Sequence, residues 1–122
     1  MTSSAMSRPL EIRLGAAGDA LDRFEAAWHR VAEGRAMRPL EVLSFPDLPS
    51  LLRTLSAARW VLLQKLGAEG PLSIYELAKR LGRDYKNVHT DVTQLAAIRL
   101  IQREADGKVT VPWEWLRAEL KL

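Results

Sequence analysis

Polar side chains with hydrogen-bonding groups are concentrated in residues 85–98, between apolar residues at helical spacing. Val88, Val92 and Leu95 follow one another at intervals of four and three residues, so they share one face of a helix. The other faces carry groups of the kind that contact base edges and phosphates, namely Tyr85, Lys86, Asn87, His89, Thr90, Thr93 and Gln94. We therefore expect a helix over 85–98 that enters a DNA major groove. The alternative interpretation is a solvated polar face in any helical domain.

The segment before this helix has the signals of a shorter helix and a tight turn. Ser73, with a glutamate three residues later, matches a capping box and predicts a helix over 74–81. Gly82 ends this helix, because a residue without Cβ allows the sharp bend that must follow. Asp84 then caps the next helix. Ser73 and Arg83, at the two ends of the shorter helix, are further candidate DNA contacts.

Two short strands are predicted after the polar helix. Residues 100–104 and 108–111 have strand character, and the Asp106-Gly107 pair between them is a strong hairpin signal. Arg103 and Lys108 flank this turn, so we expect them near the hairpin tip, in contact with phosphate or the minor groove. The alternative is a solvated pair of cross-strand charges.

A long helix is predicted before all of these elements, over residues 50–66, and it ends at Gly67. Its apolar residues are Leu51, Leu52, Leu55, Trp60, Leu62, Leu63 and Leu66. The order of helix, short helix, tight turn, helix and hairpin is that of a winged helix-turn-helix, which we assign to residues 47–111. In such a module the short helix props the next one at a steep angle, so that it can project into a groove.

The most distinctive stretch of the sequence is Gly70-Pro-Leu-Ser-Ile-Tyr-Glu-Leu-Ala-Lys-Arg-Leu-Gly-Arg-Asp-Tyr-Lys-Asn-Val-His-Thr-Asp-Val92, above all its Arg-Asp-Tyr-Lys-Asn-Val-His part. With residues 100–101, 109–112, 10–33 and 44–45, it resembles a family of MarR-like DNA-binding transcriptional regulators, some encoded beside toxins. The resemblance implies a winged helix-turn-helix with a DNA-reading helix at 85–98. Such families often have Arg in place of Thr90 and Gly in place of Arg99. An arginine in the left-handed conformation there would be strained.

Residues 10–46 are predicted to form a strand-helix extension behind a disordered tail, residues 1–9. Alternation predicts a strand over 10–14, followed by a turn at Gly15-Ala-Ala-Gly18 and an amphipathic helix over 20–33. The following residues, up to 46, look extended. We expect the apolar side chains of this extension at a homodimer or partner interface, and they are Leu10, Ile12, Leu14, Leu21, Phe24, Trp28 and Val31.

The last segment, residues 112–122, is predicted to hold a C-terminal strand over 116–122 that lies at the edge of a sheet. This strand could pair with strand 10–14 of the same chain, or with strands of a second chain across a two-fold axis. Trp113 and Trp115 precede it. They would form either a surface for a partner or a lid over the core, with the indole N–H groups reaching solvent.

The net charge of +3 is unevenly distributed, since residues 47–111 carry ten Lys and Arg against seven Asp and Glu. Such an excess attracts polyanions such as nucleic acid. Asp84 and Asp91 nevertheless indicate that not every turn of the polar helix can approach the DNA backbone. The absence of cysteine fits a reducing cytoplasm. We expect a cytoplasmic protein with no membrane contact, since neither a signal peptide nor a spanning run is evident.

Enzymatic chemistry is not expected. His29 and His89 are the two histidines and fall on different predicted helices, without the spacing of a metal-ligand pair. The strand-Gly15-Ala-Ala-Gly18-helix start lacks a third glycine and a conventional βαβ context, so we interpret it as a plain turn and not as a phosphate cradle. No serine has the surroundings of a nucleophile elbow. We predict no cofactor.

The sequence thus predicts an α+β fold that is mainly helical, a winged helix-turn-helix with an N-terminal strand-helix extension and a C-terminal strand. The leading functional hypothesis is a sequence-specific, dimeric regulator that binds double-stranded DNA. One alternative is an antitoxin-type protein that sequesters a toxin and regulates its own gene. The other is an RNA-binding or architectural protein without sequence specificity.

Overall fold

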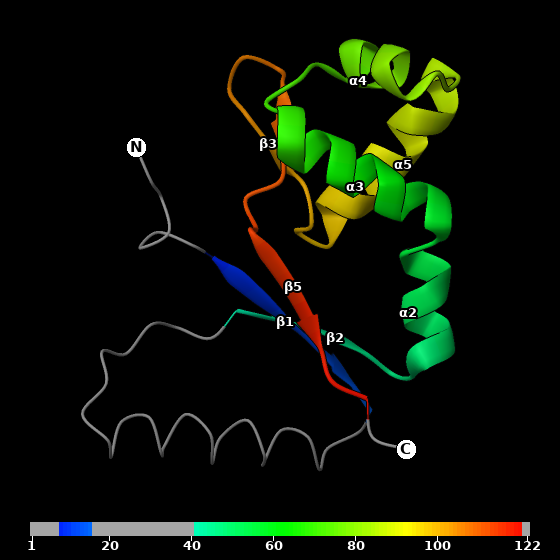
Figure 1. Ribbon diagram of the computed structural model, residues 1–122, viewed down its shortest axis with the longest axis vertical. Coiled ribbons are helices and arrows are strands. Elements are labelled where there is room, and N and C mark those ends of the chain that lie inside the picture. Colours follow the sequence, from blue (N-terminus) through cyan, green and yellow to red (C-terminus); the bar gives the residue numbers. More distant parts are fainter. Residues whose placement is uncertain (1–7, 16–40, 121–122) are drawn as a thin grey trace, which may run out of the picture. The chain divides into compact units, whose positions relative to one another are not determined.

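The computed structural model describes residues 8–15 and 41–120 and shows an α+β fold (Figure 1). The chain forms two compact units, which we describe separately. One comprises Arg53–Glu114 together with Arg8, and the other contains the strands on either side of it in the sequence. The N-terminal and C-terminal segments, which the sequence suggested as separate regions, therefore belong to one unit.

The first unit begins at the end of α2 (Leu48–Thr54). Its further elements are α3 (Ala57–Glu69), α4 (Ile74–Leu81), α5 (Tyr85–Ala97), β3 (Gln102–Arg103) and β4 (Val109–Thr110). Helix α3 packs against α4 and β4, and α4 packs against α5. The fully buried side chains of this unit are Leu62, Leu66, Leu77, Val88, Val92, Leu95, Leu100 and Val109. One apolar core thus holds the three helices and the hairpin together.

The local signals around α4 and α5 are confirmed. The Ser73 hydroxyl accepts a hydrogen bond from the Glu76 amide at 3.0 Å, and the Asp84 carboxylate accepts one from the Asn87 amide at 3.3 Å. Gly82 adopts the left-handed conformation, with φ of 64° and ψ of 33°. Val88, Val92 and Leu95 are each 0% exposed, as the spacing predicted.

The prediction of a single helix over 50–66 is wrong, because the chain forms two helices there. Ser56 lies between α2 and α3 in an extended conformation, and its hydroxyl accepts a hydrogen bond from the Arg59 amide at 3.3 Å. A serine at this position satisfies a backbone donor that would otherwise lack a partner, so a new helix starts after it. Helix α3 also continues past Gly67 and ends at Glu69, before the Gly70-Pro71 connection. Leu52 and Trp60, two of the apolar residues of the predicted helix, are 58% and 43% exposed.

The hairpin is antiparallel as predicted, with Gln102 opposite Thr110 and Arg103 opposite Val109, but its strands are shorter than 100–104 and 108–111. Leu100 and Ile101 are buried in the core, at 1% and 2% exposed, and do not extend the ladder. The tip is closed by the Glu104 amide, which donates to the Lys108 carbonyl at 2.8 Å.

The second unit contains a three-stranded sheet in the order β2-β1-β5, all parallel (Figure 1). The strands are β1 (Pro9–Leu14), β2 (Val42–Phe45) and β5 (Trp115–Ala118). Strand β1 confirms the prediction over 10–14, and it pairs with the C-terminal strand of the same chain. That strand is shorter than 116–122, because residues 119 and 120 leave the ladder and residues 121–122 lie outside the described residues.

Strands β1 and β2 are neighbours and run parallel. The connection between them lies mostly outside the described residues, so the plain turn at Gly15-Ala-Ala-Gly18 stays a prediction. Gly15 itself has φ of 111°, and its amide donates to the Phe45 carbonyl at 3.0 Å. The predicted helix over 20–33, including Leu21, Phe24, Trp28, His29 and Val31, lies outside the described residues.

Two of the three interface residues predicted on β1 are buried in the described structure. Leu10 and Ile12 are 4% and 3% exposed, and Leu14 is partly buried. Alternate residues of a strand point to the same face of its sheet, so these three side chains line one face.

Candidate nucleic-acid interface

Helix α5 presents three stripes of side chains along its length. The stripe made by Val88, Val92 and Leu95 is fully buried. Directly opposite lies an outer stripe of exposed residues with the same four- and three-residue spacing, made by Lys86, Thr90 and Thr93. Thr90 uses its hydroxyl to donate to the Lys86 carbonyl at 3.0 Å, which anchors that side chain to its own helix. The outer stripe therefore offers one cationic and two hydroxyl side chains to solvent.

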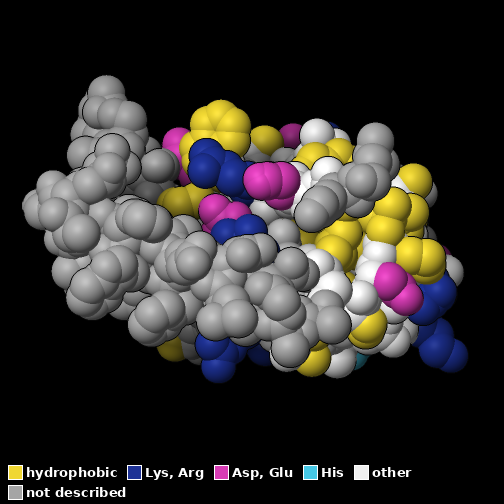
Figure 2. Space-filling view, turned by 90° about the horizontal axis from the view of Figure 1, so that it is seen from below, with side chains coloured by type: hydrophobic (Ala, Val, Ile, Leu, Met, Phe, Trp, Pro, Cys, Tyr) yellow, Lys and Arg dark blue, Asp and Glu magenta, His cyan; other side chains and the backbone are white. Residues whose placement is uncertain are grey.

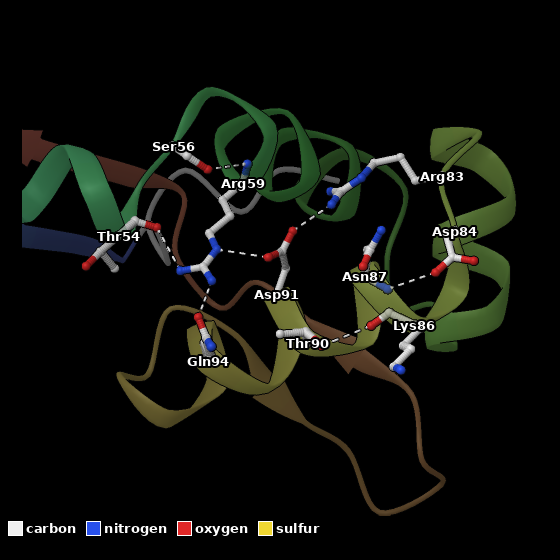
Figure 3. A network of polar contacts seen from close by, with 10 residues as sticks. All are labelled: Thr54, Ser56, Arg59, Arg83, Asp84, Lys86, Asn87, Thr90, Asp91 and Gln94. Carbon is white, nitrogen blue, oxygen red and sulfur yellow. Dashed lines mark hydrogen bonds and ion pairs between the residues drawn. The ribbon is translucent and has the colours of Figure 1, made fainter.

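A flank stripe between these two is made by Asn87, Asp91 and Gln94, and it faces α3 (Figure 3). Asp91 lies between two arginines. Its Oδ1 is 3.0 Å from Arg59 Nε, and its Oδ2 is 2.8 Å from Arg83 Nη2. The Asp91 side chain is 15% exposed, against 16% for Arg59 and 28% for Arg83. The carboxylate is thus largely shielded from solvent, and two guanidinium groups balance its negative charge.

Arg59 connects this carboxylate to further groups. Its Nη2 donates to Gln94 Oε1, and its Nη1 donates to the Thr54 carbonyl at 3.2 Å (Figure 3). We call Arg59, Arg83, Asp91 and Gln94 the arginine–aspartate network. Sequence reasoning missed Arg59, because nothing local distinguishes it from other surface arginines. It also assigned Arg83 and Gln94 to direct DNA contact, whereas both side chains are engaged within the chain.

The expectation that Asp91 would keep part of the helix away from a DNA backbone has to be revised in one respect. Two guanidinium groups surround this carboxylate, so the local charge of the cluster is positive and not negative. Asp84, the other acidic residue, is occupied in capping α5. Neither acid projects an uncompensated charge from the middle of the helix.

At the start of α5, Tyr85 and His89 lie side by side. Their ring centroids are 5.9 Å apart and their planes are inclined by 37°. Both residues are exposed, and Tyr85 is 49% exposed. This pair forms the border of the outer stripe on the side away from the network. Ser73, also predicted as a DNA contact, is partly buried, and its hydroxyl accepts the hydrogen bond that caps α4.

The hairpin is linked to α5 through the outer stripe. Arg103 Nη2 on β3 donates to the Thr93 hydroxyl at 3.4 Å, and both residues are exposed. Lys108 is exposed at the other side of the hairpin tip, and its amide donates to Asp106 Oδ1 at 3.0 Å. The structure therefore brings Lys86, Thr90, Thr93 and Arg103 together on exposed surface of the same unit.

At the end of α5, Arg99 takes the left-handed conformation, which is strained for a residue other than glycine. Arg99 has φ of 69°, and its amide donates to the Ala96 carbonyl at 3.1 Å. The Arg99 carbonyl accepts a hydrogen bond from the Trp113 indole at 2.8 Å. Trp113 is 9% exposed, and the Arg8 guanidinium lies 4.7 Å from the centre of its ring. Trp113 is therefore buried, as the lid interpretation requires, but its indole N–H bonds to a backbone carbonyl and does not reach solvent as predicted. Trp115 is 61% exposed.

A second charged cluster joins α3 to α4. Glu69 lies 2.9 Å from Arg80 and 3.2 Å from Lys65, and Arg80 lies 3.0 Å from Glu76. Hydrogen bonds from Arg80 and then from Lys65 hold the pKa of Glu69 below its ordinary value. Those side chains are solvent-exposed at more than a third, so the cluster contributes little to stability. It has no member on α5.

Comparison with known families identifies the chain as a member of the HVO_A0114 family, whose sequence model matches residues 54–118. The match starts at the last residue of α2 and extends through the three helices, the hairpin and β5. A comparison with curated proteins found no match.

The described part of the chain shows neither a metal site nor a membrane-spanning helix. Among its side chains, no group of three or more His, Cys, Asp and Glu is arranged to hold a metal ion. None of its helices combines the length and the apolar character needed to cross a membrane.

Proposed function

We propose that Arg53–Glu114 is a winged helix-turn-helix module and that the protein is a non-enzymatic transcriptional regulator that binds duplex DNA. The element order α3, α4, α5, β3, β4 supports the module, as does the left-handed Gly82 between α4 and α5. The resemblance of residues 70–92 to MarR-like regulators points the same way.

The observation that carries the proposal is the outer stripe of α5 next to Arg103. A helix whose one face is fully buried and whose opposite face is exposed can enter a major groove without leaving the core. Lys86 and Arg103 supply the cationic contacts to phosphate, and Thr90 and Thr93 are short enough to let the helix approach base edges. Asn87, at the border of the stripe, has the amide that pairs with adenine in two hydrogen bonds.

We further propose that the protein acts as a homodimer on a two-fold related operator. The exposed large hydrophobic side chains on α3, Trp60 and Val61, support a protein contact, at 43% and 52% exposed. Hydrophobic side chains also gather on the described part of the face drawn in Figure 2, where acidic and basic side chains lie next to each other.

The experiment is selection of bound fragments from random duplex DNA with the full chain, followed by titration of the enriched duplex, an unrelated duplex and an RNA duplex. We expect one enriched motif with two related halves about one helical turn apart. Equal affinity for all three nucleic acids would favour the architectural or RNA-binding alternative. A failure to bind any of them would contradict the proposal.

A further inference from the structure

We infer that Asp91 is a positioning residue of α5, which fixes the rotation of this helix about its axis and so decides which side chains face outward together. The inference rests on the proposed function for its effect on DNA recognition. The mechanical part depends only on the arginine–aspartate network. Asp91 contacts no DNA in this account and acts through Arg59 and Arg83.

The first step concerns directionality. The buried stripe holds α5 on the core through apolar contacts, which are favourable over a range of small rotations because burial is not directional. The contacts of Asp91 with Arg59 Nε and Arg83 Nη2 are short, charge-assisted and made by two different oxygens. Figure 3 shows Arg59 and Arg83 on either side of the carboxylate along α5, so a rotation that carries Asp91 away from α3 lengthens both contacts.

The second step concerns the anchors at the far ends of these contacts. Arg59 belongs to α3 and is itself tied to the Thr54 carbonyl and to Gln94, one helical turn after Asp91. Arg83 belongs to the turn that follows Gly82, whose amide bonds fix it to the end of α4. The network therefore ties α5 to α3 through Arg59 and to the end of α4 through Arg83.

The third step connects the network to the outer stripe. Asp91 follows Thr90 directly and lies one turn after Asn87 on the flank stripe. In Figure 3 the side chain of Lys86 points away from the network while Asp91 points into it. A rotation that frees Asp91 would turn Lys86, Asn87 and Thr90 by the same angle, because a helix turns as one body. Base readout needs closer geometry than phosphate contact, so sequence preference would suffer most.

The test compares Asp91→Asn with Glu69→Gln in the full chain. Both changes convert a carboxylate held by two cations into an amide and alter the net charge equally, but Glu69 touches no residue of α5. One readout is the ratio of affinities for the selected duplex and an unrelated duplex. The other is the distance distribution between nitroxide labels at Gln64→Cys and Ala97→Cys, both exposed sites in a chain without native cysteine.

We expect Asp91→Asn to lower the affinity ratio about tenfold and to broaden the label distances, with neither change in Glu69→Gln. An unchanged distance distribution would overturn the inference whatever the DNA result. A broadened distribution with an unchanged ratio would overturn it as well, since the network would then be only structural. If the unaltered chain binds no duplex, the proposed function fails, and the label distances alone decide whether Asp91 positions α5.

Discussion

At the scale of single residues, Lys86 and Asn87 are expected to contribute to DNA binding in different ways. Lys86→Ala removes a cation from the outer stripe, so affinity for all duplexes should fall together and the salt dependence should become flatter. Asn87→Ala should instead cost about 1–3 kcal/mol on the selected duplex alone if the amide makes two bonds to one base. Fluorescence titration at several salt concentrations measures both effects. Unchanged affinity and salt slope in both variants would remove Lys86 and Asn87 from the interface.

Residue types near the helix ends could be predicted from the sequence because their partners are local. Ser73 and Asp84 each cap a helix through an amide three residues away, and Gly82 needs only its own backbone conformation. The contact of Arg59 with Asp91 joins residues that are 32 positions apart. Such a contact follows from the packing of α3 beside α5, which no local pattern encodes.

At the scale of elements, the α4–α5 turn should be sensitive to a single methyl group. Gly82 has positive φ and open space around the position of a Cβ, so Gly82→Ala would strain only the backbone. We expect it to lower the free energy of unfolding by about 1 kcal/mol. Gly67→Ala is the matched control, since it lies inside α3 with one ordinary contact, to Val111 at 4.0 Å. It should raise stability by up to about 1 kcal/mol. Denaturant unfolding distinguishes the two, and a destabilising Gly67→Ala would contradict this account.

The hairpin prediction concerns Arg103 and Lys108, which flank the tip. Replacing both with alanine should weaken DNA binding while the melting temperature stays within a few degrees, because exposed charges contribute little to stability. The comparison is a variant with Glu104 and Asp106 replaced by alanine, in which the same hairpin loses two acidic side chains and not two basic ones, and its DNA affinity and melting temperature are measured in the same way. A double variant Arg103→Ala/Lys108→Ala with full affinity and a lowered melting temperature would show that the hairpin is structural only.

Element boundaries were predicted well where a cap or a left-handed residue marks them and poorly where apolar residues run on. The apolar residues between Leu51 and Leu66 predict a single helix over 50–66, and they hide Ser56, which caps a new helix within that run. Leu100 and Ile101 were included in the predicted strand 100–104. In the structure they are buried in the core, and the strand begins only at Gln102. A run of apolar residues predicts burial more reliably than it predicts whether the segment is a helix, a strand or a loop.

At the scale of the whole molecule, the exposed pair on α3 makes the oligomeric state testable. If Trp60 and Val61 form a dimer contact, Val61→Lys should give a monomer at micromolar concentration, because a two-fold contact would place the two lysines in the same interface. Tyr75→Lys is the matched control, on a side chain that is 68% exposed on α4. Light scattering on the full chain measures the mass. A monomeric unaltered protein, or a dimer in both variants, would rule out this contact.

The sheet shows where whole-molecule prediction from the sequence ends. Alternation in residues 10–14 and near the C-terminus was sufficient to predict strands, and their pairing within the chain was one of two alternatives. The parallel direction of β2 was not foreseen, since strand direction depends on the path of the connection and not on side-chain type. A truncation before Val42 would remove β1, the central strand, and is therefore a poor probe of dimerisation.

The pairing of β1 with β5 also has a consequence during synthesis of the chain. Pro9 pairs with Trp115, so one edge of β1 stays open until synthesis has reached Trp115. At about 5–20 residues per second, this interval lasts on the order of 5–20 seconds. The contacts among α3, α4, α5 and the hairpin span shorter stretches of sequence and can form meanwhile. A nascent chain halted before Trp115 would expose an unpaired strand edge to neighbouring chains, and such edges recruit foreign strands.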